Sequence, residues 1–514
     1  MSDVRWAGGA ANNNKCEQRE APMILSIDQG TTGTTAFVFD NEGSLLGRSY
    51  SEFPQYYPQP GWVEHRADEI WAVTQRVSAA ALERAGVSAT ELSAIGITNQ
   101  RETTVLWDRK TGEPVHPAIV WQCRRSAEVC KAHERAGRAD WLRQKTGLVL
   151  DAYFSASKLQ WMFERYPELA ARARAGELCF GTIDSWLIWK MSGGRAHLTD
   201  HTNASRTLLY DLASGDWDAE LLDLFDCPVE ILPAIRPSAA YFVDTDPHAF
   251  LGASAPITGV AGDQQAALFG QGCTRPGLIK NTYGTGCFML AYAGNERPEA
   301  PAGLLTTVAC GPDGAPAYAL EGAVFNAGSA VQWLRDEMGL IRYAEETEAI
   351  AQRVQDTRGV YLVPAFSGLG APHWDPTARG TICGLSRGTG KDELVRATLE
   401  SIAYQSNELA GLMSQALGVP LACLRVDGGA SANNFLMQFQ SDISDVRVER
   451  PRQVESTAVG AALLAGIGAG MWQPGKRPES LQEIERDFVP QMDPGRREEL
   501  ISGWQRAVRA CRTF

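Results

Sequence analysis

The sequence lacks the long apolar runs and the metal-ligand spacings that mark several large protein classes. No stretch of 18 apolar residues occurs in the 514 residues, so we expect no transmembrane helix. Residues 1–6 lack the apolar core of a secretory signal peptide. The 7 histidines show neither H-E-x-x-H nor zinc-finger spacing. These absences argue against a membrane-spanning protein and against a structural zinc protein.

Positively charged residues are fewer than negatively charged ones, and the cysteines do not occur in recognisable pairs. Lys and Arg number 48 against 61 Asp and Glu, which gives a net charge of −13. A nucleic-acid partner, which needs a basic stripe, is therefore not expected. The 11 cysteines are an odd number without C-x-x-C pairs, which is typical of reduced thiols in a cytoplasmic protein.

What is present is the composition of a large globular protein, with 44 % apolar and 21 % charged residues. The length predicts two or more domains. Residues 1–22 are rich in Gly, Ala and Asn, which predicts a disordered extension, and Met23 is an alternative start. An internal repeat, described next, places a domain boundary near residue 270, so we predict domains over 23–270 and 271–514.

The repeat consists of two hairpins with Gly/Thr turns. Residues 24–40 read as strand, turn and strand, with Asp28 closing the first strand and Thr31, Thr32 and Gly33 in the turn. Such a turn offers backbone N–H groups and hydroxyls to a polyphosphate. Asp28 beside phosphates is suited to hold Mg²⁺ through water. An ordinary hairpin with an acidic turn cap is the alternative.

The second hairpin covers residues 278–290, with Thr285 in its turn. Residues 321–333 read as a loop of small residues that enters a helix. A strand from Leu424 runs into Gly428-Gly429, a turn that can admit a flat base and its ribose against the backbone. The second half therefore predicts a nucleotide site.

Three polar or aromatic groups follow apolar segments in the first half. Arg101-Glu102 follows the strand 95–98, at the strand end where α/β proteins bind ligands. An adjacent cation and anion suit a neutral polyol, although a surface ion pair is the simpler interpretation. Trp121 ends the predicted strand 118–122 and is either core or a substrate contact. Asp263 follows a strand and opens a helix, so it is a helix N-cap, a proton acceptor in a cleft, or both.

Several strings in the same order resemble the glycerol kinases of the FGGY family of carbohydrate kinases, within the actin/Hsp70 ATPase superfamily. The strings cover residues 28–32, 96–103, 120–125, 262–270 and 281–290. Residues 153–161 and 380–400 resemble the two family signatures. The resemblance spans residues 23–514 and implies an α/β fold of two ribonuclease H-like domains with an interdomain cleft.

The resemblance implies phosphorylation of glycerol to sn-glycerol 3-phosphate by ATP with Mg²⁺ oriented by Asp28. Asp263 would be the general base. The glycerol hydroxyls would be held by Arg101, Glu102, Tyr153, Asp263 and Gln264, and its carbon edge by Trp121 and Phe288. The ATP site would be lined by Thr31, Thr32, Gly33, Thr285, Gly328, Gln332, Gly429 and Asn433. We expect a homodimer or homotetramer.

Two departures from the family pattern bear on phosphate contacts and regulation. Many members continue the first turn as Ser-Ser-Arg, whereas Gly33-Thr34-Thr35 stands here, so one arginine contact is missing or supplied from elsewhere. Residues 237–274 contain no Lys or Arg, so we predict no inhibition by fructose 1,6-bisphosphate, which needs cations. Clear inhibition at millimolar levels in a rate assay would contradict this. His248 could be phosphorylated, but an exposed loop histidine is the favoured interpretation.

Two other functions remain open from the sequence. One is an FGGY kinase for another polyol or a ketose, such as erythritol or xylulose. The other, from a different class, is an actin- or Hsp70-like protein that switches with nucleotide. Turnover of ATP that is independent of any polyol would favour the second.

Overall fold

The computed structural model describes residues 22–373, 375, 377–452, 455–481 and 483–513. The extension expected to be disordered lies, apart from residue 22, outside these residues. Within them, no helix is long and apolar enough to cross a membrane. The ten cysteines in the described ranges are all free.

A six-stranded mixed sheet forms the core of the first half of the chain. Its strands, in the order in which they are hydrogen-bonded, are β13 (Ala239–Asp244), β14 (Pro256–Gly262), β5 (Leu92–Asn99), β1 (Met23–Gln29), β2 (Gly33–Phe39) and β3 (Leu45–Glu52). The three central strands β14, β5 and β1 run parallel. They are almost wholly buried, as expected for strands covered on both faces.

A seven-stranded mixed sheet forms the core of the second half. Its order is β17 (Leu305–Cys310), β18 (Pro316–Val324), β16 (Cys287–Gly294), β15 (Leu278–Tyr283), β21 (Cys423–Asp427), β22 (Val448–Pro451) and β23 (Ile484–Phe488). β15 pairs antiparallel with β16 and parallel with β21. β1 pairs in the same way with β2 and β5, so the two predicted hairpins occupy equivalent places in the two sheets.

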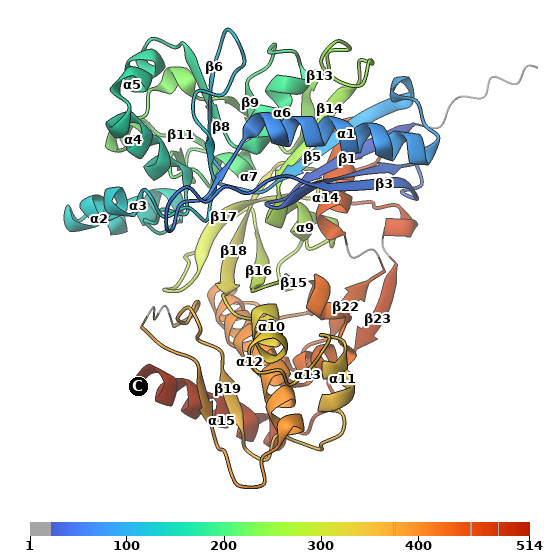
Figure 1. Cartoon of the computed structure of the whole chain (residues 1–514). Helices are drawn as coiled ribbons and strands as arrows, with labels where there is room; N and C mark the ends of the chain where they lie inside the picture. The colour runs from blue at the N-terminus through green and yellow to red at the C-terminus, as the bar shows by residue number, and fades with distance from the viewer. Residues whose placement is uncertain (1–21, 374, 376, 453–454, 482, 514) are drawn as a thin grey trace, which may run out of the picture.

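Helices cover both sheets and build a side lobe on the first half (Figure 1). The helices of the first half are α1 (Ala67–Ala85), α2 (Ala127–Arg135), α3 (Ala139–Thr146), α4 (Ser155–Arg165), α5 (Pro167–Arg174), α6 (Ile183–Met191), α7 (His201–Ala204), α8 (Ala219–Leu224) and α9 (Asp263–Gly270). Those of the second half are α10 (Gly328–Asp336), α11 (Glu346–Ala351), α12 (Lys391–Leu417), α13 (Asn434–Ser444), α14 (Ser456–Gly468) and α15 (Pro494–Thr513).

Ten short strands complete the described structure. They are β4 (Glu64–His65), β6 (Val105–Asp108), β7 (Ala118–Ile119), β8 (Leu178–Gly181), β9 (Leu198–Asp200), β10 (Tyr210–Asp211), β11 (Asp216–Trp217), β12 (Ala234–Arg236), β19 (Tyr361–Val363) and β20 (Thr381–Cys383). They form paired ribbons outside the two main sheets.

Two local predictions from the sequence were wrong. The apolar segment 118–122 keeps only Ala118 and Ile119 in a strand, because the backbone turns at Val120, whose carbonyl accepts from Cys123 N at 2.9 Å. Residues 321–324 are not loop but the end of β18, paired with β16. The small residues Gly322 and Ala323 are typical of a loop, but here they lie inside a strand that is mostly buried.

Helix α14 belongs to the second half in sequence but packs on the sheet of the first half (Figure 1). It lies against β1, β5, β14 and α9. Its residues Ala458–Gly466 are buried on every side of the helix, which is the pattern of an internal helix. The two halves are therefore joined through a shared apolar core.

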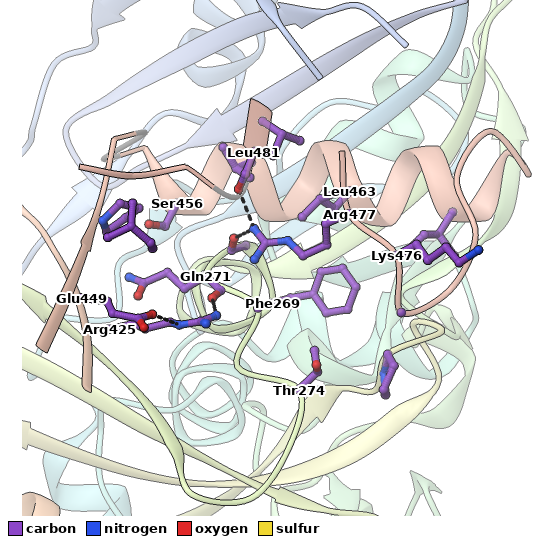
Figure 2. Close-up of a pocket in the computed structure, with 18 residues that line it drawn as sticks. Phe269, Gln271, Thr274, Arg425, Glu449, Ser456, Leu463, Lys476, Arg477 and Leu481 are labelled. Atoms are coloured by element: carbon purple, nitrogen blue, oxygen red, sulfur yellow. Dashed lines mark hydrogen bonds and ion pairs between the residues drawn. The ribbon is translucent and has the colours of Figure 1, made fainter. Parts of the chain in front are cut away.

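A cavity of about 320 Å³ lies where the end of α9 meets the second sheet (Figure 2). Arg425 donates a hydrogen bond to the carbonyl of Gln271, and Arg477 donates to the carbonyl of Gly270. These two arginines satisfy carbonyls at the carboxyl end of α9, which would otherwise lack partners. The helix that begins with Asp263 is thus anchored at its other end by the second half of the chain.

Candidate active site

Two parallel strands bring Arg101 and Asp263 to one edge of the first sheet. Arg101 follows β5, and Asp263 follows β14 as the first residue of α9. Because β5 and β14 are parallel neighbours, their carboxyl ends meet at the same edge. Arg101 Nε lies 3.2 Å from Asp263 Oδ1. Glu102 has a φ of 62°, a left-handed conformation that is unfavourable for a residue with a Cβ and that clusters at functional sites.

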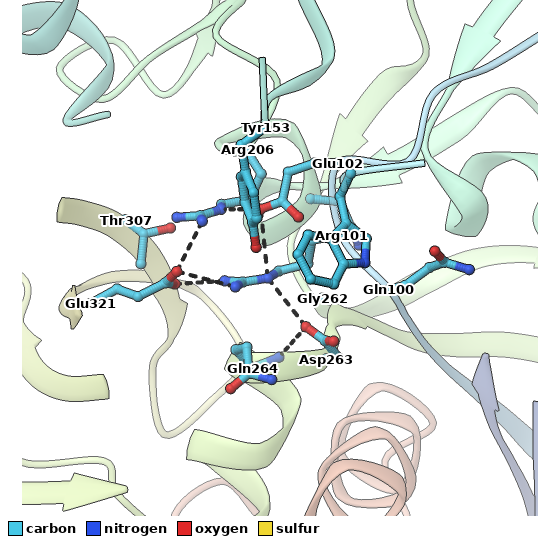
Figure 3. A network of polar contacts seen from close by, with 12 residues as sticks. Gln100, Arg101, Glu102, Tyr153, Arg206, Gly262, Asp263, Gln264, Thr307 and Glu321 are labelled. Carbon is cyan, nitrogen blue, oxygen red and sulfur yellow. Dashed lines mark hydrogen bonds and ion pairs between the residues drawn. The ribbon is translucent and has the colours of Figure 1, made fainter. Parts of the chain in front are cut away.

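Five charged side chains form one network at this edge (Figure 3). Arg101 pairs with Glu321 through two nitrogens, at 2.6 and 3.1 Å. Arg206 Nη2 contacts the same carboxylate at 2.9 Å, and its Nε contacts Glu102 Oε1 at 2.6 Å. Asp263 completes the set through Arg101. All but Asp263 are almost fully buried, so these charges depend on one another for stability.

Burial raises the pKa values of the carboxyl groups in this network, and the neighbouring arginines lower them. Burial alone would raise the pKa of Glu321, but Arg101 and Arg206 lower it to about 2. Burial raises the pKa of Asp263 above its ordinary value, against the effect of Arg101 and of the Gln264 backbone N–H. The buried Glu102 also has a raised pKa, although Arg101 and Arg206 favour its charged form. Asp263 thus combines a raised pKa with an accessible side chain, 31 % of which is exposed, whereas Glu102 is buried.

Two lysines hold Gln264 and Tyr153, which the sequence predicts to bind the substrate. Lys280 Nζ donates to Gln264 Oε1 and, at 2.7 Å, to Thr282 Oγ1. Lys158 Nζ donates to the carbonyls of residues 152, 153 and 154. This arrangement fixes the backbone that carries Tyr153, whose ring stands edge-on to Trp121 with centroids 5.3 Å apart.

A cavity of about 640 Å³ opens beside the network and lies between the two halves. Trp121 and Tyr153 line it from the first half, and Thr285, Phe288 and Glu321 from the second. One end is therefore charged and the wall is aromatic. This combination suits a small molecule with several hydroxyls and a carbon edge.

A second cavity of about 360 Å³ lies in the second half. Five of the residues predicted for the nucleotide line it, namely Thr285, Gly328, Gln332, Gly429 and Asn433. Thr285 borders both cavities. The two spaces therefore meet at the turn between β15 and β16.

The first hairpin turn lies outside the lining of this second cavity. Its turn is closed by Gly30 N donating to Gly33 O at 2.9 Å, and Thr31 Oγ1 accepts from Trp121 Nε1 at 3.0 Å. Thr32 and Gly33 belong to the same turn. The geometry thus connects Thr31 with the wall of the first cavity rather than with the second.

Asp28 lies on β1 next to this turn. Burial, Asp263 and Glu455 raise its pKa to about 8. No hydrogen bond or ion pair reaches its carboxylate from the residues that the structure describes. In the β1–β2 ladder Asp28 faces Thr35. The carboxylate is therefore without the counter-charge that an ionised form requires.

Both halves of the chain match one protein family. The N-terminal domain of the FGGY family of carbohydrate kinases matches residues 23–270, and its C-terminal domain matches residues 279–469. The chain belongs to the FGGY family of carbohydrate kinases. The resemblance described from the sequence strings is confirmed.

Relatives in this FGGY family extend over nearly the whole chain. Glycerol kinase 2 of Pseudomonas aeruginosa is 53 % identical over 496 residues, which cover 96 % of this chain and 98 % of that protein. Glycerol kinase of Shewanella amazonensis is 54 % identical over 486 residues, with 95 % and 98 % covered. The crystal structure of Plasmodium falciparum glycerol kinase with ADP is 35 % identical, with a TM-score of 0.89 and 96 % and 98 % covered. The expected two-domain α/β fold of this family is thereby confirmed.

Sequence reasoning missed three residues of this kinase site, Arg206, Lys280 and Glu321. Arg206 follows α7 in a polar segment without a recognisable motif. Lys280 lies inside a strand and could have been noticed as a buried cation. Glu321 carried a similar signal, because it is the one charged residue in the otherwise apolar segment 317–324, and charged residues are rarely buried without a partner. His248, considered for phosphorylation, is exposed.

Proposed function

We propose that this FGGY kinase transfers the γ-phosphoryl group of ATP to glycerol and forms sn-glycerol 3-phosphate. The observation that carries the proposal is a cavity with one charged end and an aromatic wall, which meets the nucleotide cavity at Thr285. Relatives that bear the name glycerol kinase share about half of the sequence over nearly its full length. A neutral triol fits this site because paired charges both donate to and accept from hydroxyls.

In this proposal the substrate residues have distinct roles. Arg101 and Gln264 donate to glycerol hydroxyls, and Glu102 accepts from one. Tyr153 closes the pocket with its phenol group, while Trp121 and Phe288 lie against the carbon edge. The aromatic contact of Trp121 with Tyr153 keeps this wall in place.

Asp263 acts as the general base. Its carboxylate takes the proton of the terminal hydroxyl while that oxygen forms its bond to the γ-phosphorus, and ADP leaves with the electrons of the broken P–O bond. The ion pair with Arg101 points one carboxylate oxygen away and leaves the other for the hydroxyl. Phosphoryl transfer needs chiefly positioning and charge neutralisation, and we assign the base about 10²–10⁴-fold of the rate.

The nucleotide occupies the second cavity, and its phosphates extend towards the two hairpin turns. Thr31, Thr32, Gly33 and Thr285 would hold the phosphates, with Gly328, Gln332, Gly429 and Asn433 around the nucleoside. Asp28 would hold a Mg²⁺ ion through water, because it is buried beside Asp263 and Glu455, which both raise its pKa further, and no cation among the described residues pairs with it. When bound, the ion supplies neutralisation of phosphate charge. Among the described residues no group of three or more His, Cys, Asp or Glu could hold a metal.

The decisive experiment measures ATP consumption with and without glycerol and identifies the product by mass. Glycerol-dependent formation of glycerol 3-phosphate would support substrate, reaction and site together. Turnover with erythritol or xylulose instead would favour another FGGY specificity. Turnover that no polyol or sugar changes would favour a nucleotide-switched protein.

Three further expectations belong to the same proposal. The division into domains at 23–270 and 271–514 follows the repeat of the hairpins. A cytoplasmic location follows from the 11 cysteines without C-x-x-C pairs, a pattern typical of reduced thiols. The homodimer or homotetramer follows from the family resemblance alone, and light scattering after size exclusion measures it.

A further inference from the structure

One carboxylate from the second half of the chain reaches into the charged edge of the first. Glu321 lies on β18 of the second sheet, paired with β16 and β17. Its partners Arg101 and Arg206 both come from the first half, after β5 and after α7. The side chains of Glu321, Arg101 and Arg206 are 6 %, 2 % and 0 % exposed. These contacts therefore exist only while the two halves are together.

The same contacts set the orientation of Arg101. Glu321 binds both terminal nitrogens of its guanidinium, at 2.6 and 3.1 Å. Asp263 and Glu102 lie near Nε, at 3.2 and 3.7 Å, and Gln265 Oε1 accepts from Nη1 at 3.2 Å. A planar guanidinium that is bound through two nitrogens has a fixed plane. Glu321 thus determines where Arg101 points, although Arg101 is the residue assigned to the substrate.

Arg206 ties the second acidic residue of the site to the same carboxylate. Its Nη2 contacts Glu321 at 2.9 Å, and its Nε contacts Glu102 at 2.6 Å. Separating the halves would take Glu321 away from both of its arginine partners, and would leave Arg101 with Asp263 and Glu102 and Arg206 with Glu102 alone, a loss of buried charge pairing that is costly. Closure of the halves and assembly of the polyol pocket are therefore one event.

We propose that Glu321 and Arg206 form a latch between the halves, in which Glu321 positions Arg101 and Arg206 positions Glu102 for the substrate. This inference rests on the proposed glycerol kinase function for the identity of the substrate, but not for the latch itself. Although both residues line the substrate cavity, in this proposal they act through Arg101 and Glu102, so they are positioning residues. The latch makes the binding of the polyol depend on a closed cleft.

The test compares wild type with Glu321→Gln and Arg206→Gln. In both variants we expect KM for glycerol to rise about 10²-fold, the scale for truncating one partner of a buried charge pair. KM for ATP should change less than about threefold, because the nucleotide cavity does not include these residues. A residue that only stabilised the fold would not separate the two KM values in this way.

A double variant tests whether the two residues act together. If they form one latch, KM for glycerol in Glu321→Gln/Arg206→Gln should lie within about threefold of the worse single variant, whereas independent residues would multiply their effects. Arg143→Gln is the matched control, because Arg143 also joins the halves, by donating to the carbonyls of Ala300 and Pro301, away from the network. Its KM for glycerol should stay at the wild-type value.

A measurement without substrate separates failure of the latch from failure of the proposed function. Small-angle scattering of the unliganded protein should give a larger radius of gyration for Glu321→Gln than for wild type. Absence of glycerol turnover in wild type would refute the proposed function and leave this measurement as the test of the latch. An unchanged radius, or an unchanged KM for glycerol, would overturn the latch. If Glu321→Gln does not fold, Glu321→Asp, which keeps the charge one methylene shorter, replaces it with the same expected direction.

Discussion

Asp263 is placed between groups that act on it in opposite directions. Burial and Glu321 raise the pKa of its carboxyl, whereas Arg101 and Lys280 lower it. The Gln264 N–H donates to Oδ1 at 2.7 Å, and the same oxygen faces Arg101. Oδ1 is thus held by two contacts, and Oδ2 is the oxygen that would accept the proton of the substrate hydroxyl in the proposed reaction.

At the scale of single residues, the Asp263→Asn variant should lose most of its turnover but still bind glycerol and ATP. The amide has nearly the same shape but cannot accept the proton, so we expect kcat to fall about 10²–10⁴-fold. Steady-state kinetics and calorimetric titration with glycerol and nucleotide measure the two effects. Turnover within tenfold of wild type in Asp263→Asn would remove Asp263 from the role of base.

His65 shows how a residue without substrate contact supports the first hairpin. Its ring is fully buried, with Nε2 2.7 Å from Gln55 Oε1 and Nδ1 3.5 Å from Gln100 Nε2. Gln55 in turn donates to the carbonyl of Thr31 at 3.1 Å. A neutral imidazole satisfies both contacts, since one nitrogen donates and the other accepts. Burial accordingly lowers the pKa of His65 to about 4.

Acid should therefore destabilise the wild type more than His65→Gln. Between pH 6.5 and 4 the unfolded chain binds a proton at this residue that the folded chain does not, so the contribution of His65 to stability falls as pH falls. We expect the difference in Tm to move in favour of the variant across this window. Thermal unfolding at several pH values measures it. A constant difference from pH 7 to pH 4 would mean that His65 does not titrate in this way.

At the scale of elements, helix α14 approaches its neighbours at glycines. A Cβ at Gly460 would overlap the carbonyl oxygen of Ala266 in α9, and a Cβ at Gly270 would overlap that of Ser456. Gly96 and Gly259 allow the same close approach between α14 and the strands β5 and β14. These glycines are required for proximity rather than for backbone conformation, since none of the four has a positive φ.

Gly460→Ala should push α14 away from α9, the helix that begins with Asp263. We expect a loss of stability of about 1–3 kcal/mol from overpacking and a lower kcat, because the base moves with its helix. Gly411→Ala in α12 is the matched control, since nothing lies within 4 Å of its Cβ position. It should stabilise by about 1 kcal/mol through helix propensity. Denaturant unfolding and kinetics on both variants check the pair, and equal behaviour would contradict the packing argument.

At the scale of the whole molecule, the proposed reaction would require groups from both halves at one place. Asp28 and Asp263 come from the first sheet and its edge, and the nucleotide cavity from the second half. A cation near Asp28 would lie where phosphates from one half meet carboxylates from the other. Burial, Asp263 and Glu455 raise the pKa of Asp28, and a nearby cation would favour its ionised form.

Removal of divalent cations should stop turnover, and Mg²⁺ should restore it. In Asp28→Asn we expect the Mg²⁺ concentration for half-maximal rate to rise by about tenfold or more, because the carboxylate that orders the hydrated ion is gone. Rates during titration with Mg²⁺ after EDTA treatment measure this shift. An unchanged requirement in the variant would place the ion elsewhere.

The sequence by itself determined the two hairpins, the strand ends at Arg101 and Asp263, and the Gly-Gly turn of the nucleotide site. These signals are local: glycines and threonines between β-forming runs, and polar residues directly after buried strands. The family strings added the roles. The residues named for the polyol and five of those named for the nucleotide border the cavities or the charged network, whereas Asp28, Thr32 and Gly33 border neither.

Only the tertiary structure decided how the halves meet. Glu321 and Arg206 are 115 residues apart in sequence, and no periodicity predicts that they share a carboxylate contact. The placement of α14 on the first sheet depends on glycines in four different elements, which sequence spacing does not relate. Contacts of this kind follow from the packing of whole sheets, whereas turns and strand ends follow from the chemistry of neighbouring residues.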